Sequence, residues 1–328
     1  MKVLVVGYGS IGQRHIENIS YLKNVEILVQ TKRKYDKILK NKCSKILHSL
    51  SAAINEKPDV AIISNVTSQH METAIKLAQS KVDIFLEKPI SNSLSGMNTL
   101  LNLIKKNNLI TQVGCQFRFH QCIVKIKEII DNDEIGRVIS VKVECGSYLP
   151  DWHPYEDYRK SYAARNDLGG GVVLTCIHEI DYLYWLFGDV EEVFSITGKF
   201  SDLKINADDL STIIMCFKNK IIAEVHLDYF QKPAIRSCKV IGTKGIIYWD
   251  SDSNTVKLYD FHNDTWKTKF KMKKYDRNIL FVKEVEHFFQ SVKERKETIN
   301  PIQTDGVKTL KIALAILKSA KNRKIVKL

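Results

Sequence analysis

The sequence predicts an α/β fold in two parts: an N-terminal Rossmann domain with a doubly wound parallel sheet, and a C-terminal α+β domain with a large open, mostly antiparallel sheet. In the first third of the chain, short β-branched segments alternate with segments of helical periodicity, which is typical of parallel sheets. After about residue 120, strand follows strand with short turns, which indicates antiparallel pairing. The 328 residues are also too many for one ordinary core. We expect a Rossmann domain over 1–120 and a substrate-binding and oligomerisation domain over 121–328, whose C-terminal helix can pack back on the first.

The elements of the first domain follow in order. Residues 2–7 form an apolar run that ends in glycine, as a buried parallel strand does. Residues 10–22 follow as a helix, because apolar side chains recur at positions 11, 16, 19 and 22. The alternation continues with strands over 25–30, 59–65, 82–89 and 110–117 and with helices over 71–81 and 95–108.

The second domain is expected to hold strands over 138–148, 190–200, 210–218, 221–230, 235–250 and 255–261. Helices are expected over 121–132, 175–187, 279–294 and 303–321. The alternation of apolar and polar residues in two of these strands leaves one sheet face partly apolar. We therefore expect a homodimer or a homotetramer.

Composition excludes several classes of protein. The apolar runs are shorter than the roughly 20 residues that a bilayer span needs, so no membrane partner is expected. The net charge of +13 comes mostly from lysines interleaved with acids, without a nucleic-acid-binding motif, so no nucleic-acid partner is expected. Seven scattered cysteines form no C-x-x-C pair, which favours a reducing cytoplasm and no metal site.

A G-x-G-x-x-G motif lies between the first strand and the first helix. Gly7 would make the tight turn, Gly9 would let a pyrophosphate approach the backbone, and Gly12 would let helix and strand pack closely. Ser10 and Ile11 open the helix, whose free N–H groups and dipole favour phosphate. The motif predicts a dinucleotide site; the alternative is a glycine-rich structural turn.

The end of the second strand bears on the choice of cofactor. An NAD site usually has an acidic residue about 20 residues after the glycines. Here the sequence continues with Thr31, Lys32, Arg33 and Lys34, which could hold a 2′-phosphate. NADP is therefore favoured over NAD, and the alternative is an exposed basic loop beside a cofactor held by its pyrophosphate.

Four motifs together resemble those of the Gfo/Idh/MocA family of oxidoreductases. They are GYGSIGQRHI at 7–16, SNVTSQH at 64–70, EKP at 87–89 and GGGVVLTCIHEID at 169–181. The resemblance covers essentially the whole chain. It implies cofactor contacts from Asn65, His70, Glu87, Lys88 and Gln116, and a substrate contact from Arg118.

The resemblance also implies the catalytic residues. Lys88 matches the family lysine that lies beside the nicotinamide and touches the substrate hydroxyl, and His178 matches the catalytic histidine. A histidine, with an ordinary pKa near 6.5, suits a general base for alcohol oxidation. The alternatives are a surface lysine and a buried structural histidine.

One departure from the family pattern concerns the residue four before the histidine. The family has an aspartate there, whereas this chain has Leu174. Thr175, three before His178 and on much the same face of the predicted helix, could orient the imidazole or the substrate instead. Asp181 matches an aspartate that contacts substrate hydroxyls in some relatives. The glycine triplet at 169–171 is expected to admit cofactor and substrate.

The segment 147–165 is rich in aromatic and basic residues. Trp152 and His153 suit a sugar ring, and Arg159, Lys160 and Arg165 suit a phosphate or carboxylate. A loop packed on its own domain or on another subunit is the alternative. Similar loops in family members tied to bacterial surface-glycan synthesis suggest an acidic or nucleotide-linked sugar, CMP- or UDP-linked, as the substrate.

The sequence thus predicts a cytoplasmic NAD(P)-dependent sugar dehydrogenase or reductase that acts on CH–OH groups. Two alternatives stay open. One is an NAD-dependent glycosidase of the same family, which oxidises its substrate transiently. The other is a catalytically silent cofactor-binding protein, because the family's aspartate is missing.

Overall fold

The computed structural model describes residues 1–33 and 37–328, and Lys34 lies outside them. The chain divides into two compact units. Unit 1 contains residues 1–116 and 277–310, and unit 2 contains residues 117–276 and 311–328. The division expected from the sequence at residue 120 assigned 277–310 to the second domain, whereas in the structure these residues belong to unit 1.

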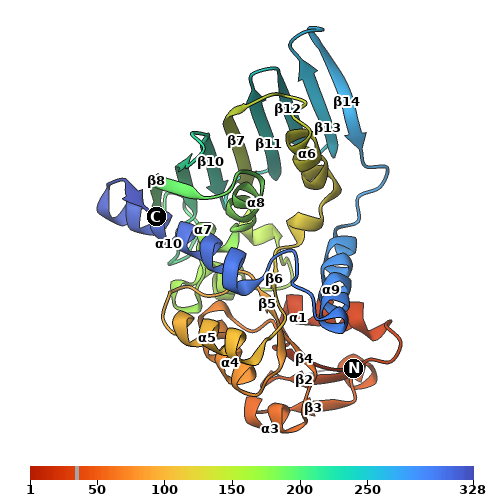
Figure 1. The fold of residues 1–328 in the computed structure, drawn as a ribbon. Helices are drawn as coiled ribbons and strands as arrows, with labels where there is room; N and C mark the ends of the chain where they lie inside the picture. The colour runs from red at the N-terminus through yellow and green to blue at the C-terminus, as the bar shows by residue number, and fades with distance from the viewer. Residues whose placement is uncertain (34–36) are drawn as a thin grey trace. The chain divides into compact units, whose positions relative to one another are not determined.

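Unit 1 is built on a six-stranded parallel sheet in the order β3-β2-β1-β4-β5-β6 (Figure 1). Neighbouring strands all run parallel, and the order reverses between β1 and β4. In such sheets, ligands bind at the carboxyl ends of the strands beside this reversal. The strands are β1 (Lys2–Val6), β2 (Glu26–Gln30), β3 (Lys45–Leu47), β4 (Val60–Ile63), β5 (Asp83–Glu87) and β6 (Thr111–Gly114).

Six α-helices belong to unit 1 in the described residues, besides the start of α10. They are α1 (Ser10–Ser20), α2 (Lys37–Lys42), α3 (Leu50–Asn55), α4 (Thr67–Gln79), α5 (Met97–Asn107) and α9 (Arg277–Glu294). The sequence did not predict β3, α2 or α3, each of which has six residues or fewer. Such short elements carry too few periodic positions to stand out.

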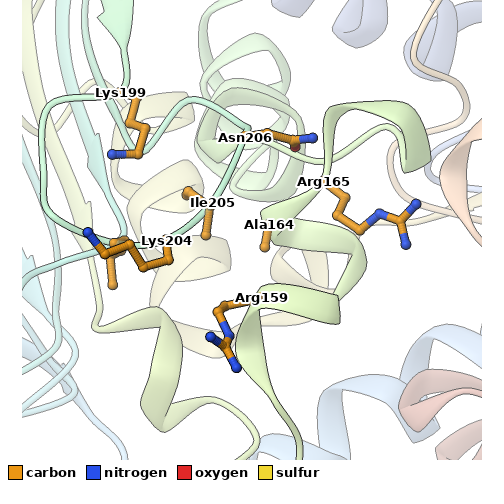
Figure 2. A pocket seen from close by; sticks show the side chains of 8 residues that line it. Arg159, Ala164, Arg165, Lys199, Lys204, Ile205 and Asn206 are labelled. Carbon is orange, nitrogen blue, oxygen red and sulfur yellow. The ribbon is translucent and has the colours of Figure 1, made fainter.

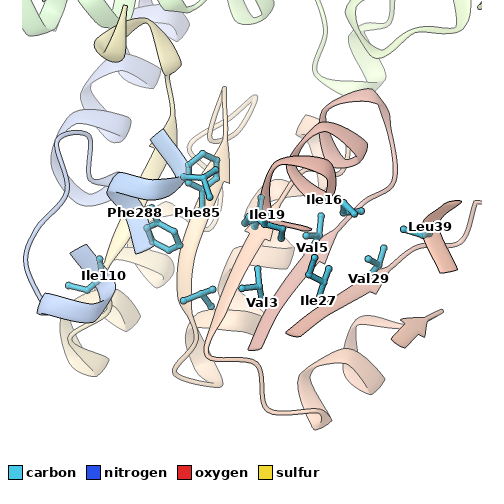
Figure 3. Packing of buried hydrophobic residues seen from close by; sticks show 13 residues of the cluster. Val3, Val5, Ile16, Ile19, Ile27, Val29, Leu39, Phe85, Ile110 and Phe288 are labelled. Atoms are coloured by element: carbon cyan, nitrogen blue, oxygen red, sulfur yellow. The ribbon is translucent and has the colours of Figure 1, made fainter. Parts of the chain in front are cut away.

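The core of unit 1 lies between this sheet, α1 and α9 (Figure 3). Val3 and Val5 of β1 are fully buried, as expected for a strand covered on both faces. Phe85 of β5 packs against Phe288 of α9, with ring centroids 5.7 Å apart. The late helix α9 therefore completes the core of the first unit.

Unit 2 is built on a nine-stranded sheet in the order β14-β13-β12-β11-β7-β10-β9-β8-β15. The β7–β10 pair is parallel and the other pairs are antiparallel, which confirms the mostly antiparallel sheet. The strands are β7 (Val138–Gly146), β8 (Val190–Gly198), β9 (Leu210–Phe217), β10 (Ile222–Asp228), β11 (Ile235–Gly242), β12 (Gly245–Asp250), β13 (Thr255–Asp260), β14 (Thr265–Lys271) and β15 (Val326–Lys327).

The helices of unit 2 are α6 (Gln121–Asp131), α7 (Val172–Thr175), α8 (His178–Phe187) and most of α10 (Val307–Asn322). The helix predicted over 175–187 is in fact divided, because α7 ends at Thr175 and α8 begins at His178. In the described part of the chain, no helix has the length and apolar character needed to cross a bilayer.

Candidate active site

The three glycines of the first loop differ in what surrounds them. A side-chain carbon on Gly7 would lie 2.7 Å from the Asn65 nitrogen, and one on Gly12 would lie 2.3 Å from the Gly7 oxygen. Gly7 also has a φ of +104°, which favours glycine. No described atom lies within 4 Å of the corresponding position on Gly9. The protein's own packing therefore explains Gly7 and Gly12 but not Gly9, and a ligand close to the backbone would explain it.

Helix α1 begins directly after Gly9. Gly9 is the N-cap, and no side chain caps the first turn. The N–H groups at Ser10 and Ile11 thus stand at an uncapped helix N-terminus, where the positive end of the helix dipole favours phosphate.

Two buried amide oxygens follow strands β4 and β6, which lie on either side of β5. Asn65 donates through Nδ2 to Thr73 Oγ1 at 3.0 Å, but its Oδ1 has no hydrogen-bond partner among the described residues. The Oε1 atom of Gln116 is equally buried and without a described partner. Buried polar atoms are normally bonded. These two oxygens and the open position at Gly9 fit a dinucleotide whose amide or hydroxyl groups would supply the missing donors.

The residues expected to choose the cofactor follow β2. Thr31 is buried, and its Oγ1 accepts a hydrogen bond from the Arg33 backbone N–H at 3.0 Å. Its hydroxyl thus stabilises the turn itself. Lys32 and Arg33 are exposed, so their charged ends remain available to a 2′-phosphate.

His70 joins two loops of unit 1. Its Nδ1 lies 2.8 Å from the backbone oxygen of Pro89, and its Nε2 lies 3.1 Å from the backbone oxygen of Asn65. Burial lowers the pKa of His70 below its ordinary value, so the neutral ring is favoured. A neutral ring has a single N–H, so His70 lies between the EKP turn and the Asn65 loop and donates to one of the two backbone oxygens at a time. Any effect of His70 on a cofactor would act through those loops.

The EKP turn places Lys88 at the end of β5. Glu87 Oε1 lies 2.7 Å from His15 Nε2, and Glu87 Oε2 accepts the Lys88 backbone N–H at 3.2 Å. Lys88 itself is half-buried. A buried carboxylate therefore fixes the backbone that carries the predicted catalytic lysine.

In unit 2, the glycine triplet packs against the protein itself. Gly169 and Gly171 have φ values of +81° and +100°. A side-chain carbon on Gly170 would lie 2.1 Å from the Tyr162 oxygen, and one on Gly171 would lie 2.4 Å from Asp208 Oδ1. The backbone turn and the neighbouring loops therefore already require glycine here, and the approach of cofactor and substrate to the triplet stays a prediction.

His178 is the first residue of α8 and is buried. Its ring lies 5.2 Å from that of Phe117, between centroids, and the Arg236 guanidinium lies 4.1 Å from the centroid of the same Phe117 ring. Arg236 also pairs with the buried Glu179, with 2.7 Å between Nε and Oε1. Sequence reasoning missed Phe117, Glu179 and Arg236, because a single phenylalanine, glutamate or arginine gives no distinct signal in a sequence.

The position of the missing family aspartate is apolar. Leu174 is buried in α7. Thr175 ends α7 and lies beside the buried Tyr229. Burial of the Tyr229 hydroxyl raises its pKa well above the usual value near 10. The break between α7 and α8 means that Thr175 and His178 do not share one continuous helix face, contrary to the expectation.

Two residues expected at the substrate pair with each other. Arg118 donates through Nε and Nη2 to the two carboxylate oxygens of Asp181, at 2.9 and 2.8 Å, and both side chains are almost fully buried. This bidentate pair neutralises both charges inside unit 2. The structure thus gives these side chains each other as partners, and their contact with a substrate hydroxyl stays a prediction.

The 147–165 segment folds as short 3₁₀ turns. Trp152 is half-buried and donates to Ser147 Oγ at 2.9 Å, and His153 lies 3.0 Å from the Tyr155 hydroxyl. A surface pocket of about 420 Å³ opens between this segment and the 199–206 loop (Figure 2). Its lining is basic and contains Arg159, Ala164, Arg165, Lys199, Leu203, Lys204, Ile205 and Asn206.

Comparison with known proteins agrees with the fold and the glycine loop. A model of an oxidoreductase family with an NAD-binding Rossmann fold matches residues 1–115, and a model of the GFO/IDH/MocA C-terminal domain matches residues 123–248. The chain is therefore an oxidoreductase with an NAD-binding domain. It belongs to the Gfo/Idh/MocA family.

Individual relatives are distant, but their alignments cover most of both proteins. Myo-inositol 2-dehydrogenase of Thermotoga maritima is 26% identical over 344 residues, covering 100% of this chain and 98% of the relative. Glucose-6-phosphate 3-dehydrogenase of Bacillus subtilis is 22% identical over 278 residues, covering 79% and 77%. The structure of levoglucosan dehydrogenase in complex with NADH has a TM-score of 0.89 at 16% identity, covering 100% of this chain and 98% of that chain. This last likeness concerns the fold.

Proposed function

We propose that this oxidoreductase moves hydride between the nicotinamide of NAD(P) and a sugar carbon that bears a hydroxyl or keto group. The observation that carries the proposal is the carboxyl edge of the first sheet. There the open position at Gly9 follows β1, and Lys88 follows β5. The amide oxygens of Asn65 and Gln116, which have no partner among the described residues, follow β4 and β6. The names of two relatives, a polyol dehydrogenase and a sugar-phosphate dehydrogenase, support the substrate class.

Each catalytic role follows from ordinary side-chain chemistry. The bound nicotinamide would supply the hydride acceptor or donor. Lys88 would polarise the reacting oxygen and exchange its proton, because a lysine ammonium is a compact charge with three N–H donors on a flexible stem. His178 would be a second group for proton transfer, since an imidazole changes charge near neutral pH.

The basic pocket of unit 2 supports an acidic or phosphorylated sugar as substrate. Arg159 pairs with Asp157 and Arg165 with Asp167, whereas in the described chain no ion pair is found for Lys199 or Lys204. These two ammonium groups would favour a carboxylate, a phosphate or the diphosphate of a nucleotide-linked sugar. A role in surface-glycan synthesis would fit such a substrate.

The proposal extends to assembly and location. Side chains of Phe194, Ile196 and Ile222 are exposed on β8 and β10, and a homodimer or homotetramer would cover them. Light scattering at micromolar concentration should give a mass above that of the 37.7 kDa chain, and a monomer would contradict this part.

All seven cysteines are free, which suits the cytoplasm.

The first prediction concerns the cofactor. Titration should give tighter binding of NADP than of NAD, and Arg33→Ala should remove about 1.5–3 kcal/mol from NADP binding alone. Gly9→Ala should weaken both cofactors while changing the free energy of unfolding by less than about 0.5 kcal/mol, because its new methyl group meets open space. Gly12→Ala is the contrasting variant and should unfold more easily. Tighter NAD binding that Arg33→Ala leaves unchanged would contradict the NADP preference.

The second prediction concerns catalysis. Absorbance of the reduced cofactor should reveal turnover on a panel of neutral, phosphorylated, UDP-linked and CMP-linked sugars. Lys88→Ala should lower turnover strongly with little change in cofactor affinity, and His178→Ala should lower turnover roughly 10²–10⁴-fold, the usual range for a positioned acid or base. If His178→Ala retains full activity, the histidine is structural and Lys88 acts alone.

The same assay tests the substrate class. The double variant Lys199→Gln/Lys204→Gln should raise KM for the acidic sugars and leave KM for the neutral ones in place. Lys257→Gln, which removes an exposed lysine from β13, is the matched control. Equal effects on acidic and neutral sugars would remove the pocket from the proposal. Release of a leaving group without net cofactor reduction would instead favour the glycosidase.

A further inference from the structure

Three titratable side chains meet in the interior of unit 1. His15 comes from α1, Glu87 from the end of β5 and Glu284 from α9, and one nitrogen or oxygen atom of each lies within 4.8 Å of the others. Their exposed fractions are 0%, 5% and 0%. The catalytic roles proposed above use none of these three side chains directly.

The contacts within this cluster are unequal. Glu87 receives two donors, since one oxygen lies 2.7 Å from His15 Nε2 and the other accepts the Lys88 backbone N–H. Neither carboxyl oxygen of Glu284 has a hydrogen-bond partner among the described residues. The rings of Phe85 and Phe281 lie 5.3 and 6.3 Å from the His15 ring, so the surroundings are largely apolar.

Few other charges face Glu284. From β5 and the turn after it come Glu87 and Lys88, from α1 comes His15, and β6 offers the neutral Gln112, whose Nε2 donates to the Glu284 backbone oxygen at 2.8 Å. On α9 itself, one turn to either side, stand Leu280, Phe281, His287 and Phe288. The pKa of His287 is lowered by burial, so this ring tends to be neutral.

Two buried carboxylates so close together cannot both carry charge at low energetic cost. Glu87 has donors that stabilise its anion, whereas no described residue donates to Glu284. Burial raises the pKa of Glu284 well above its ordinary 4.5, the negative charge of Glu87 raises it further, and the charge of Lys88 lowers it.

We propose that His15, Glu87 and Glu284 form a buried proton-holding site beside Lys88, in which Glu284 is the neutral acid and Glu87 the anion. With Glu284 neutral, Glu87 is the one carboxylate of the cluster whose charge acts on Lys88. The site therefore positions the Lys88 backbone through Glu87 and keeps a second negative charge away from the ammonium. This role for Lys88 rests on the proposed function, whereas the location of the proton does not.

A metal ion is the competing occupant of such a cluster. Two ligands of one tetrahedral ion at 2.0–2.2 Å would stand about 3.4 Å apart. The 2.7 Å between His15 Nε2 and Glu87 Oε1 is a hydrogen-bond distance instead. The geometry thus favours a hydrogen bond between His15 and Glu87 over a metal ion bound to both.

The test of the proton is the pH dependence of unfolding in the full-length chain. If folded Glu284 keeps a proton that the unfolded chain releases, stability falls as pH rises from about 4.5 toward the folded pKa. The unfolding constant of the wild type, divided by that of Glu284→Gln, should then rise by up to about tenfold per pH unit in that range. A packing defect in the variant would change this ratio by the same factor at every pH, so it would leave the slope unchanged. Glu286→Gln, at an exposed position of the same helix, should give no slope.

Two outcomes of this experiment would overturn the proposal. A ratio that stays flat with pH would mean that Glu284 is ionised in the folded chain. Stabilisation of the wild type by added Zn²⁺, absent in Glu284→Gln and reversed by a chelator, would mean that the cluster is a metal site.

A second readout tests the link to Lys88. Removing the Glu87 charge should lower the pKa of Lys88, so Glu87→Gln should move the limb of the pH–rate profile due to Lys88 to lower pH. Glu284→Gln should leave that limb in position, because it replaces a neutral group by another neutral group. Equal shifts in both variants would refute the assigned charges. If the chain proves to have no dehydrogenase activity, the unfolding experiment still decides where the proton is.

Discussion

The contact between His15 and Glu87 links the two parts of unit 1 on which the site depends. His15 lies on α1, directly after the glycine loop, and Glu87 lies directly before Lys88. Hydrogen bonds to a charged group contribute about 1.5–3 kcal/mol, and losing one partner of a buried pair costs more. The neighbouring strand β6 leaves room for the Glu87 carboxyl group because it ends in a glycine. A side-chain carbon on Gly114 would lie 3.0 Å from the Glu87 carboxyl carbon.

Unit 2 uses buried charge in a similar way. Asp181 and Glu179, both on α8, pair with Arg118 and Arg236 respectively. A buried ion pair adds little net stability, but breaking one costs roughly 3–5 kcal/mol, so each pair fixes the position of its helix. These pairs hold α8, whose first residue is His178. The charged pairs that fix α8 are thus different residues from His178, which is proposed to transfer the proton.

Local patterns in the sequence were enough to predict the sheets and the glycine loop. Gly7, Gly9 and Gly12 are identified by their spacing between a strand and a helix, and Lys88 by a short motif. The glycine triplet could not be interpreted in that way, because its cause is contact with Tyr162 and with Asp208, which lies some 37 residues further along the chain. The break between α7 and α8 also escaped prediction, since the apolar pattern continues across it.

The contacts of long sequence separation could not be derived from sequence. Nothing local connects His15 or Glu87 with Glu284, which lies about 270 residues after His15 and about 200 after Glu87. The one available signal is that Glu284 interrupts an otherwise apolar helix face formed by Leu280, Phe281 and Phe288. The mutual pairing of Arg118 and Asp181 is equally non-local, so it could not be read from the sequence.

The central claim is that the glycine loop and the Lys88 turn act as one unit through His15 and Glu87. A double-mutant cycle on the dissociation constant of NADH tests it most directly, with His15→Gln, Glu87→Gln and the double variant, each first shown to be folded by its unfolding transition. We expect each single substitution to weaken NADH binding and the double variant to be hardly weaker than the worse single one, with a coupling energy above about 1 kcal/mol. Losses that simply add would contradict the claim, because they would mean that the two residues act on the cofactor independently.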